Sequence, residues 1–351
     1  MKDGLLRYYA KRTAQALFTA WATLTITFAI IRFMPGGPMD FLLAKLMMGS
    51  MGPGQSFSSP TNPEAVEAFR EIAQLYVDID PTQPIYVQYF DWFGDVLQGN
   101  LGRSIFYGEP VMEVMAPVIP WTVFIVSLAV VMSFLQQIIF GGLMANYEGS
   151  SLDTRATTLF IWIQSIPYFV WAILLLFVFA FQYGVFPISG KVNPSATVGL
   201  NWAYVSGILN HAALPVISLA IASLGGGVLA MRANSIQVLG SDYVKNARLR
   251  GLETSRISVR YIARNALLPM YTNFLLSISY VFGGSLILET IFQYRGMGWV
   301  MYRALQARDF PLMMGGFILF TFATVTAIYV ADITYPLIDP RIEEGESSES
   351  F

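Results

Sequence analysis

Six long stretches without a charged residue dominate the pattern of polar and apolar positions along the chain. A transmembrane helix needs about 20 predominantly apolar residues, so each stretch is predicted to cross a membrane. The stretches are Thr13–Ile31, Pro117–Tyr147, Ala156–Phe186, Ala212–Met231, Asn265–Leu288 and Pro311–Ala331. The pattern therefore predicts an all-α integral membrane protein with six transmembrane helices.

The overall composition agrees with a membrane protein. Of 351 residues, 55% are hydrophobic and 13% are charged, whereas a soluble domain has about 25% charged residues. The first stretch is followed by Arg32 and Pro35 rather than by a small-residue cleavage site, so we interpret it as a span and not as a signal peptide. Cysteine is absent, which excludes a disulfide framework and a thiolate metal site.

The charges in the loops predict the orientation. Cytoplasmic loops are enriched in Lys and Arg, and Lys2, Arg7, Lys11 and Arg12 precede the first stretch. The loop that follows the fourth stretch is also basic, with Arg232, Lys245, Arg248, Arg250, Arg256, Arg260 and Arg264. The loop at about 32–116 has four basic and ten acidic residues. We therefore expect a multi-pass protein of the cell membrane with both termini in the cytoplasm.

This topology divides the chain into three regions. We expect a cytoplasmic N-terminus at 1–12, a six-helix transmembrane domain at 13–338, and an acidic, disordered cytoplasmic tail at 339–351. The domain includes the extracytoplasmic loop at about 32–116 and a basic loop at about 232–264. Within the former, Glu64–Tyr76 has a helical apolar period and is expected to form an amphipathic helix. That helix either covers the ends of the spans or meets an external partner.

The predicted spans lack the groups that drive ion-coupled transport or catalysis. Ionisable residues inside spans mark ion pathways, because burying them is costly, yet these spans carry neutral residues such as Gln137 and Gln164, with Asp332 at the inner edge of the last one. The single histidine, His211, cannot build a metal site with partners of its own type. Phosphate-loop and serine-hydrolase motifs are absent. We expect no enzymatic activity and no cofactor bound by this chain.

Prolines and glycines within the spans leave two interpretations open. Pro167 and Pro215 lie in or near spans, and Gly225–Gly227 lies within one. Small residues allow transmembrane helices to approach closely, whereas proline and glycine can also bend them. The residues therefore serve either helix packing or a hinge along a pathway that opens and closes.

The segment Asp242–Leu252 in the basic loop is predicted to form a docking helix. Asp242 can cap a helix, and several residues recur at three- and four-residue spacings, so that they share one narrow face. These residues are Val244, Ala247, Arg248, Gly251 and Leu252. A short helix with a small-residue face and basic neighbours such as Lys245 suits a groove on another protein. The alternative is a solvated loop or one resting on anionic lipid headgroups.

The same segment resembles the coupling-loop signature of ABC importer permeases, which reads Glu-Ala-Ala, then Gly, then Leu-Pro. Lys245-Asn-Ala247 stands at the Glu-Ala-Ala positions, Gly251 is the glycine, and Leu268-Pro269 is the end. Two leading residues depart from the general motif and the spacing to Leu-Pro is longer. Both departures resemble the oligopeptide/dipeptide permease branch.

Further motifs resemble that branch, in its first-permease type, along nearly the whole chain. They are Arg32–Pro38, Gln83–Tyr89, Leu97–Ser104, Phe186–Gly190, His211–Pro215, Leu288–Phe292, Gly296–Gly298, Arg308–Pro311 and Asp339–Arg341. Asn100 stands where the branch usually has an acid, and Tyr76–Asp80 diverges from its usual Gly-Leu-Asp. These external departures put partner or solute details in doubt rather than the family.

The resemblance implies one permease half of an ATP-driven importer. Its partners would be a second, similar permease, two cytoplasmic ATPases that bind ATP and Mg²⁺, an external solute-binding protein and the lipid bilayer, with no nucleic acid. The residues implied in ATPase coupling are Asp242, Val244, Lys245, Ala247, Arg248, Gly251, Leu252 and Pro269. ATPase closure would move this helix and switch the spans between inward- and outward-open states. We expect a bulky residue at Gly251 to permit membrane insertion but to abolish transport.

The solute is less determined than the mechanism. The resemblance implies di- and oligopeptides, while relatives carry nickel, glutathione or oligosaccharides. A membrane scaffold or receptor subunit that moves nothing is the alternative from another class, and a channel is a third. Uptake that requires ATP and the partner subunits would distinguish the importer from both.

Overall fold

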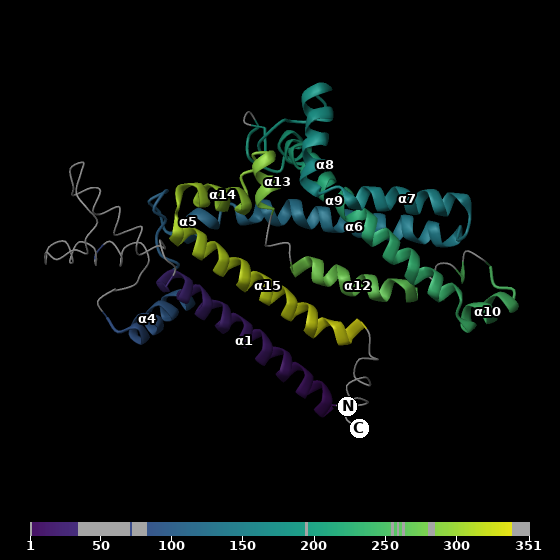
Figure 1. Ribbon diagram of the computed structural model, residues 1–351, viewed down its shortest axis with the longest axis horizontal. Coiled ribbons are helices and arrows are strands. Elements are labelled where there is room, and N and C mark those ends of the chain that lie inside the picture. Colours follow the sequence, from purple (N-terminus) through teal and green to yellow (C-terminus); the bar gives the residue numbers. More distant parts are fainter. Residues whose placement is uncertain are drawn as a thin grey trace. The chain divides into compact units, whose positions relative to one another are not determined.

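The computed structural model describes residues 2–33, 71, 83–193, 196–253, 256–257, 260–261, 264–279 and 285–338. The described residues form helices and loops, with a single isolated β-bridge between Arg103 and Pro110 and no strand among them (Figure 1). This agrees with the all-α prediction. The chain divides into two compact units, 1–120 with 299–351, and 121–298, which we describe separately.

The first unit is built on two antiparallel helices, α1 (Lys2–Phe33) and α15 (Phe310–Ile338). Near one end, Arg12 pairs with Asp332 at 3.3 Å, and Tyr8 donates a hydrogen bond to the Asp332 carbonyl oxygen. At the other end, Phe28 of α1 shares an apolar cluster with Ile318 of α15. The beginning of α1 and the end of α15 therefore lie at the same end of the pair.

Shorter helices complete this unit. They are α4 (Ile85–Leu97), α5 (Val111–Met115) and α14 (Met297–Ala307), of which α14 begins at the boundary with the second unit. Asp309 caps α15 by accepting a hydrogen bond from the Leu312 amide, at 3.2 Å. Its other carboxylate oxygen accepts from the Ser104 hydroxyl at 2.5 Å and from the Phe106 amide at 2.9 Å. The hydrogen bond between Ser104 and Asp309 thus connects two sequence motifs, Leu97–Ser104 and Arg308–Pro311.

The second unit contains α6 (Ile119–Asn146), which enters it at Trp121, and the long helix α9 (Trp202–Leu239). Asn201 caps α9 by accepting a hydrogen bond from the Tyr204 amide at 2.8 Å. The helix continues without a break through Pro215 and Gly225–Gly227. Helices α10 (Asp242–Leu249), α12 (Arg264–Ser279) and α13 (Leu286–Ile291) follow it.

The glycines of α9 lie where neighbouring helices approach most closely. A methyl group on Gly225 would overlap the Phe160 carbonyl oxygen and Gln164 of α7 (Ser151–Ser165), and one on Gly227 would overlap the Gln137 side chain of α6. Glycine therefore allows α9 to pack between both helices. Of the two interpretations of this triplet, the continuous helix favours packing over a hinge.

The third apolar stretch is not a straight span, contrary to the sequence-based expectation. Helix α7 ends at Ser165, and α8 (Tyr168–Leu175) continues directly into the π-helix η1 (Leu176–Gln182). The two helical parts are bent by 92°. Pro167 disfavours the helical conformation at the residue before it, and Ile166 is extended, with φ −94° and ψ 121°. This stretch forms a broken span or a re-entrant pair.

Four described helices are long and apolar enough to cross a membrane, or five if the bent pair counts as one span. They are the segments Arg7–Ile30, Ile119–Asn146, Trp202–Leu239 and Phe310–Thr334, with the bent pair as the fifth. The remaining stretch, Asn265–Leu288, is represented by α12 and the start of α13. The expected amphipathic helix at Glu64–Tyr76 and the tail 339–351 lie outside the described residues, apart from Glu71.

Candidate functional site

The predicted docking segment forms the short helix α10 directly after α9. Only Gly240 and Ser241 separate the two helices. Ser241 occupies the cap position, but its hydroxyl donates to the Val238 carbonyl oxygen at 2.6 Å and does not cap α10. The expectation that Asp242 caps the helix is wrong, because Asp242 is its first helical residue and pairs with Lys245 at 3.1 Å.

Gly251 terminates α10 through its backbone conformation. Its φ is +69°, a left-handed conformation that glycine adopts without the penalty a Cβ brings. The Leu252 amide donates to the Ala247 carbonyl oxygen at 3.3 Å, and the Gly251 amide donates to that of Arg248 at 2.9 Å. These two hydrogen bonds form a Schellman motif, which explains why the helix ends at Leu249 and not at Leu252.

The apolar face of α10 packs on its own chain. Val244 and Ala247 are fully or almost fully buried, together with Ile257. Val238 and Leu239 at the end of α9, and also Leu252 and Tyr261, pack around them. Three residues of the narrow face that the sequence suggested for docking, Val244, Ala247 and Leu252, therefore hold α10 against α9 and the following loop. The other two, Arg248 and Gly251, are exposed.

The opposite side of α10 faces away from the chain. Leu249 is 85% exposed and Tyr243 is 42% exposed. Other exposed residues there are Asp242, Lys245, Asn246, Arg248, Arg250 and Gly251. An exposed leucine surrounded by cations can bind an apolar pocket with an acidic rim. The last of the predicted coupling residues, Pro269, lies within α12.

An ion pair near the same end of α9 was not predicted from the sequence. Arg232 of α9 donates two hydrogen bonds to Asp153 of α7, from Nε to Oδ1 and from Nη2 to Oδ2, both at 2.6 Å. Asp153 also accepts from the Gly149 amide at 3.1 Å and is only 3% exposed. The partners are 79 residues apart, so local sequence patterns give no signal for the pair. It fixes the beginning of α7 to α9 close to α10.

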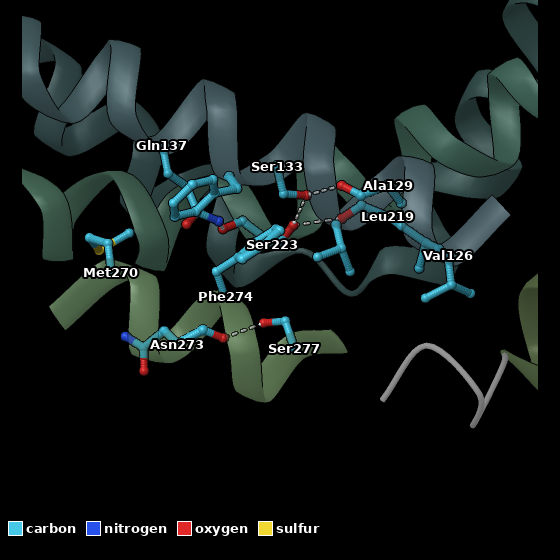
Figure 2. Close-up of a pocket in the computed structure, with 12 residues that line it drawn as sticks. Val126, Ala129, Ser133, Gln137, Leu219, Ser223, Met270, Asn273, Phe274 and Ser277 are labelled. Carbon is cyan, nitrogen blue, oxygen red and sulfur yellow. Dashed lines mark hydrogen bonds between the residues drawn. The ribbon is translucent and has the colours of Figure 1, made fainter. Parts of the chain in front are cut away.

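A cavity of about 290 Å³ lies among α6, α9 and α12, near the lower end of the range for small-molecule sites. Figure 2 shows Ser133 of α6 and Ser223 of α9 directed toward one another, with Asn273 and Ser277 of α12 across the cavity. The two serine hydroxyls are 2.7 Å apart. The remaining lining residues are Val126, Ala129, Val130, Phe134, Gln137, Leu219, Met270 and Phe274.

The cavity is uncharged but can form hydrogen bonds. The Gln137 amide group donates to the Ser223 carbonyl oxygen at 3.3 Å, and Ser277 donates to that of Asn273 at 2.7 Å. Amide and hydroxyl groups can bind peptide groups or sugar hydroxyls alike. Among the described residues, no group of three or more His, Asp or Glu side chains lies close enough to hold a metal ion.

Two further sequence motifs meet in a buried cluster around Glu289 of α13. Thr122 of α6 donates to the Glu289 carboxylate at 2.9 Å and accepts from the Met297 amide at 2.7 Å. Tyr294 is fully buried nearby, and this burial raises the pKa of its hydroxyl. A methyl group on Gly296 would collide with Thr122 and Glu289. The motifs Leu288–Phe292 and Gly296–Gly298 thus form one packed structure against α6.

Comparisons with known proteins agree with this architecture. Residues 137–344 match the family described as binding-protein-dependent transport system inner membrane component. The oligopeptide transport system permease protein AppB of Bacillus subtilis (strain 168) is 30% identical over 339 residues, which cover 96% of this chain and 99% of AppB.

Two relatives named DppB are similar over almost the same length. The di/tripeptide permease of Pseudomonas aeruginosa (strain UCBPP-PA14) is 29% identical and the dipeptide permease of Escherichia coli (strain K12) is 28% identical, each over 96% of this chain and 99% of its own. A solved structure, an amino acid ABC transporter with histidines, aligns with 72% of this chain and 98% of its own at 17% identity and a TM-score of 0.41. From the family match and these full-length similarities it follows that the chain belongs to the binding-protein-dependent transport system inner membrane components, the permease subunits of ABC importers.

Proposed function

We propose that this chain is a permease subunit of an ATP-driven, binding-protein-dependent importer of di- and oligopeptides. Relatives that are similar along almost the whole chain are named oligopeptide, di/tripeptide and dipeptide permeases. Their names favour peptides over oligosaccharides or nickel as the solute. The observation that carries the mechanism is the divided surface of α10, with one face packed on the chain and the other exposed.

The exposed face of α10 is the proposed contact with a cytoplasmic ATPase. Burial of Leu249, which is 85% exposed, would contribute about 25 cal/mol for each Å² of apolar surface removed from water. Lys245, Arg248 and Arg250 surround it and favour a partner with acidic groups. Val244 and Ala247 link α10 to Val238 and Leu239, so a displacement of α10 would be passed to α9.

The complete transporter would contain a second homologous permease, two ATPases and an external solute-binding protein. ATP and Mg²⁺ would bind to the ATPases, and this chain would bind no cofactor and catalyse no reaction. It would lie in the cell membrane with both termini in the cytoplasm, with a cytoplasmic N-terminus at 1–12, a six-helix domain at 13–338 and a cytoplasmic tail at 339–351. The coupling loop at about 232–264 would then face the ATPases.

The cavity among α6, α9 and α12 is a candidate part of the solute path. Its lining offers hydroxyl and amide groups and no charge, which suits the peptide groups that all peptides share. Such a lining would not discriminate strongly among side chains. Choice of solute would then depend on the external binding protein.

The test compares two apolar residues of α10 in the complete, reconstituted transporter. Leu249→Ser removes an exposed side chain and should leave the chain folded and in the membrane. It should reduce both the co-purification of the ATPases and ATP-dependent peptide uptake. Val244→Ala, at a fully buried position, is the matched variant and should lower the thermal stability of the permease instead.

The alternatives give different outcomes in the same experiment. Normal ATPase binding and uptake by Leu249→Ser would contradict docking through this face. Peptide uptake by the unaltered transporter without ATP would indicate a channel, and no uptake with all subunits present would indicate a scaffold or receptor. ATP-driven uptake of another solute would leave the coupling proposal intact and replace the peptide.

A further inference from the structure

Helix α4 carries three distinct faces. Trp92 and Val96 are buried, whereas Tyr86, Phe90 and Leu97 are 66%, 67% and 61% exposed. At the helical repeat of 3.6 residues, the exposed apolar residues form one stripe. Asp91 and Asp95 lie on nearly the opposite side, and the buried face lies between the two. With 13 residues, α4 is too short to cross a membrane.

Contacts with α1 fix the depth of α4 along a candidate span. The Tyr89 and Thr25 hydroxyls are 2.8 Å apart, and the ring of Phe28 lies 5.6 Å from that of Trp92. The apolar segment of α1 extends over Arg7–Ile30. Thr25 and Phe28 precede its end by five and two residues, so at 1.5 Å per residue α4 binds about 3–8 Å inside that end.

Contacts with α15 give an overlapping depth. Trp92 and Val96 share an apolar cluster with Met314 and Ile318. The candidate span of α15 begins at Phe310, so Met314 and Ile318 lie about 6–12 Å inside that end. Figure 1 shows α4 lying across the end of α1 that is opposite to the chain's N-terminus. Both sets of contacts therefore place α4 about 3–12 Å inside the ends of the two apolar segments.

We propose that α4 is an interfacial helix whose Tyr86, Phe90 and Leu97 insert among the lipids of one membrane leaflet. At that depth α1 also exposes apolar side chains, because Ile26 is 60% exposed and Ile30 is 39% exposed. Tyrosine favours the boundary between hydrocarbon and headgroups because its ring has an apolar body and a polar hydroxyl, which applies to Tyr86. The acidic face then points to water, as in other helices that lie in the membrane surface.

This placement gives α4 a role beyond packing. A helix held in the interface by lipid and by two spans anchors the chain between α1 and α6 at the membrane surface. Asp91, which is exposed, would face any partner that approaches from the water.

The absence of cysteine from the chain allows a direct test with single cysteines. Phe90→Cys and Leu97→Cys probe the apolar stripe, and Asp91→Cys, next to Phe90, is the matched control. Each variant is labelled with bimane in the complete transporter, reconstituted in phosphatidylcholine vesicles, after its size-exclusion profile has been compared with that of the unaltered protein. Fluorescence quenching is then measured with iodide in the water and with nitroxide-labelled phosphatidylcholine in the bilayer.

The two probes give opposite results if the proposal holds. Nitroxide lipid should quench bimane at Phe90 and Leu97 severalfold more than at Asp91, and iodide should show the reverse order. Iodide quenching at Phe90 equal to that at Asp91 would mean that the stripe faces water and would overturn the proposal. Protection of Phe90 and Leu97 from both quenchers would mean that a protein surface covers the stripe, which would overturn it as well.

Discussion

Asp153 and Arg232 form an ion pair whose importance depends on burial. The Arg232 side chain is 25% exposed and that of Asp153 is 5% exposed, and the bidentate geometry adds directional strength. Removing one partner of a fully buried pair costs about 3–5 kcal/mol, and the partial exposure of Arg232 reduces this through solvent screening.

Asp153→Asn should therefore lower the melting temperature of the purified permease clearly. The matched control is Asp242→Asn, because Asp242 also pairs with a cation but its side chain is 92% exposed. The control should leave the melting temperature almost unchanged. Equal melting temperatures for the two variants would show that the Asp153–Arg232 pair does not hold α7 to α9.

Gly251 allows a second test at the level of one residue. Its φ of +69° costs a residue with a side chain about 1–2 kcal/mol, but asparagine tolerates this region better than β-branched residues do. No described atom lies within 4 Å of a Cβ built at this position, so conformation and not space limits the substitution. Gly251→Asn should retain most ATP-dependent uptake, and Gly251→Val should lose much of it.

Both variants would be compared at equal amounts in the membrane. An equal loss of uptake in both variants would show that position 251 must lack a side chain, and that the left-handed conformation is not the cause. That result would indicate that a partner packs directly on Gly251.

At the scale of elements, the packing of α9 depends on which glycine receives a side chain. A methyl group on Gly225 meets the backbone of α7, while one on Gly226 comes no closer than 3.4 Å, to the Gln164 amide oxygen. Overpacking costs about 1–3 kcal/mol, and replacing glycine by alanine within a helix gains about 1 kcal/mol. Gly225→Ala should therefore lower the thermal stability in detergent, and Gly226→Ala should preserve or raise it.

The two alanine variants share the same helix and the same chemical change, so their difference isolates the contact with α7. If both raised stability equally, the close approach of α9 and α7 would be absent in the membrane. If both lowered it equally, the triplet would need flexibility rather than space, which is the hinge interpretation.

Apolarity predicted most of these elements, since four of the six stretches coincide with long helices. An apolar stretch does not reveal, however, whether its helix is straight or bent. Apolarity therefore missed the 92° bend at Pro167, although the proline itself was visible. Periodicity grouped Val244 with Ala247 correctly, but it placed the exposed Arg248 and Gly251 on the same face. It also cannot say whether the chain or a partner covers a face. The hydrogen bonds of Asp309 and Arg232 join residues far apart in sequence, and no local pattern encodes such pairings.

At the scale of the whole molecule, the α1–α15 pair restricts the number of membrane crossings. Because the beginning of α1 and the end of α15 lie at the same end of an antiparallel pair, the chain between these spans must cross an even number of times. Helices α6 and α9 run parallel, because Ser133 meets Ser223 and Gly141 meets Met231, so the chain between them must cross an odd number of times, which the bent pair can supply. Among the described helices, α12 can then supply the crossing that makes the number even, and the total becomes six.

The six-span topology places the two loops that flank the bent pair on opposite sides of the membrane. Glu148 precedes α7 and Ser189 follows η1, and both are exposed. With six spans, Glu148→Cys and Ser189→Cys should react with a membrane-impermeant maleimide from opposite sides of oriented vesicles. We expect this result, because it also brings α10 to the same side as Glu148 and the first residues of α1, where cytoplasmic ATPases could reach it. Labelling of both cysteines from one side would instead make the bent pair a re-entrant element and would contradict the parallel packing of α6 and α9.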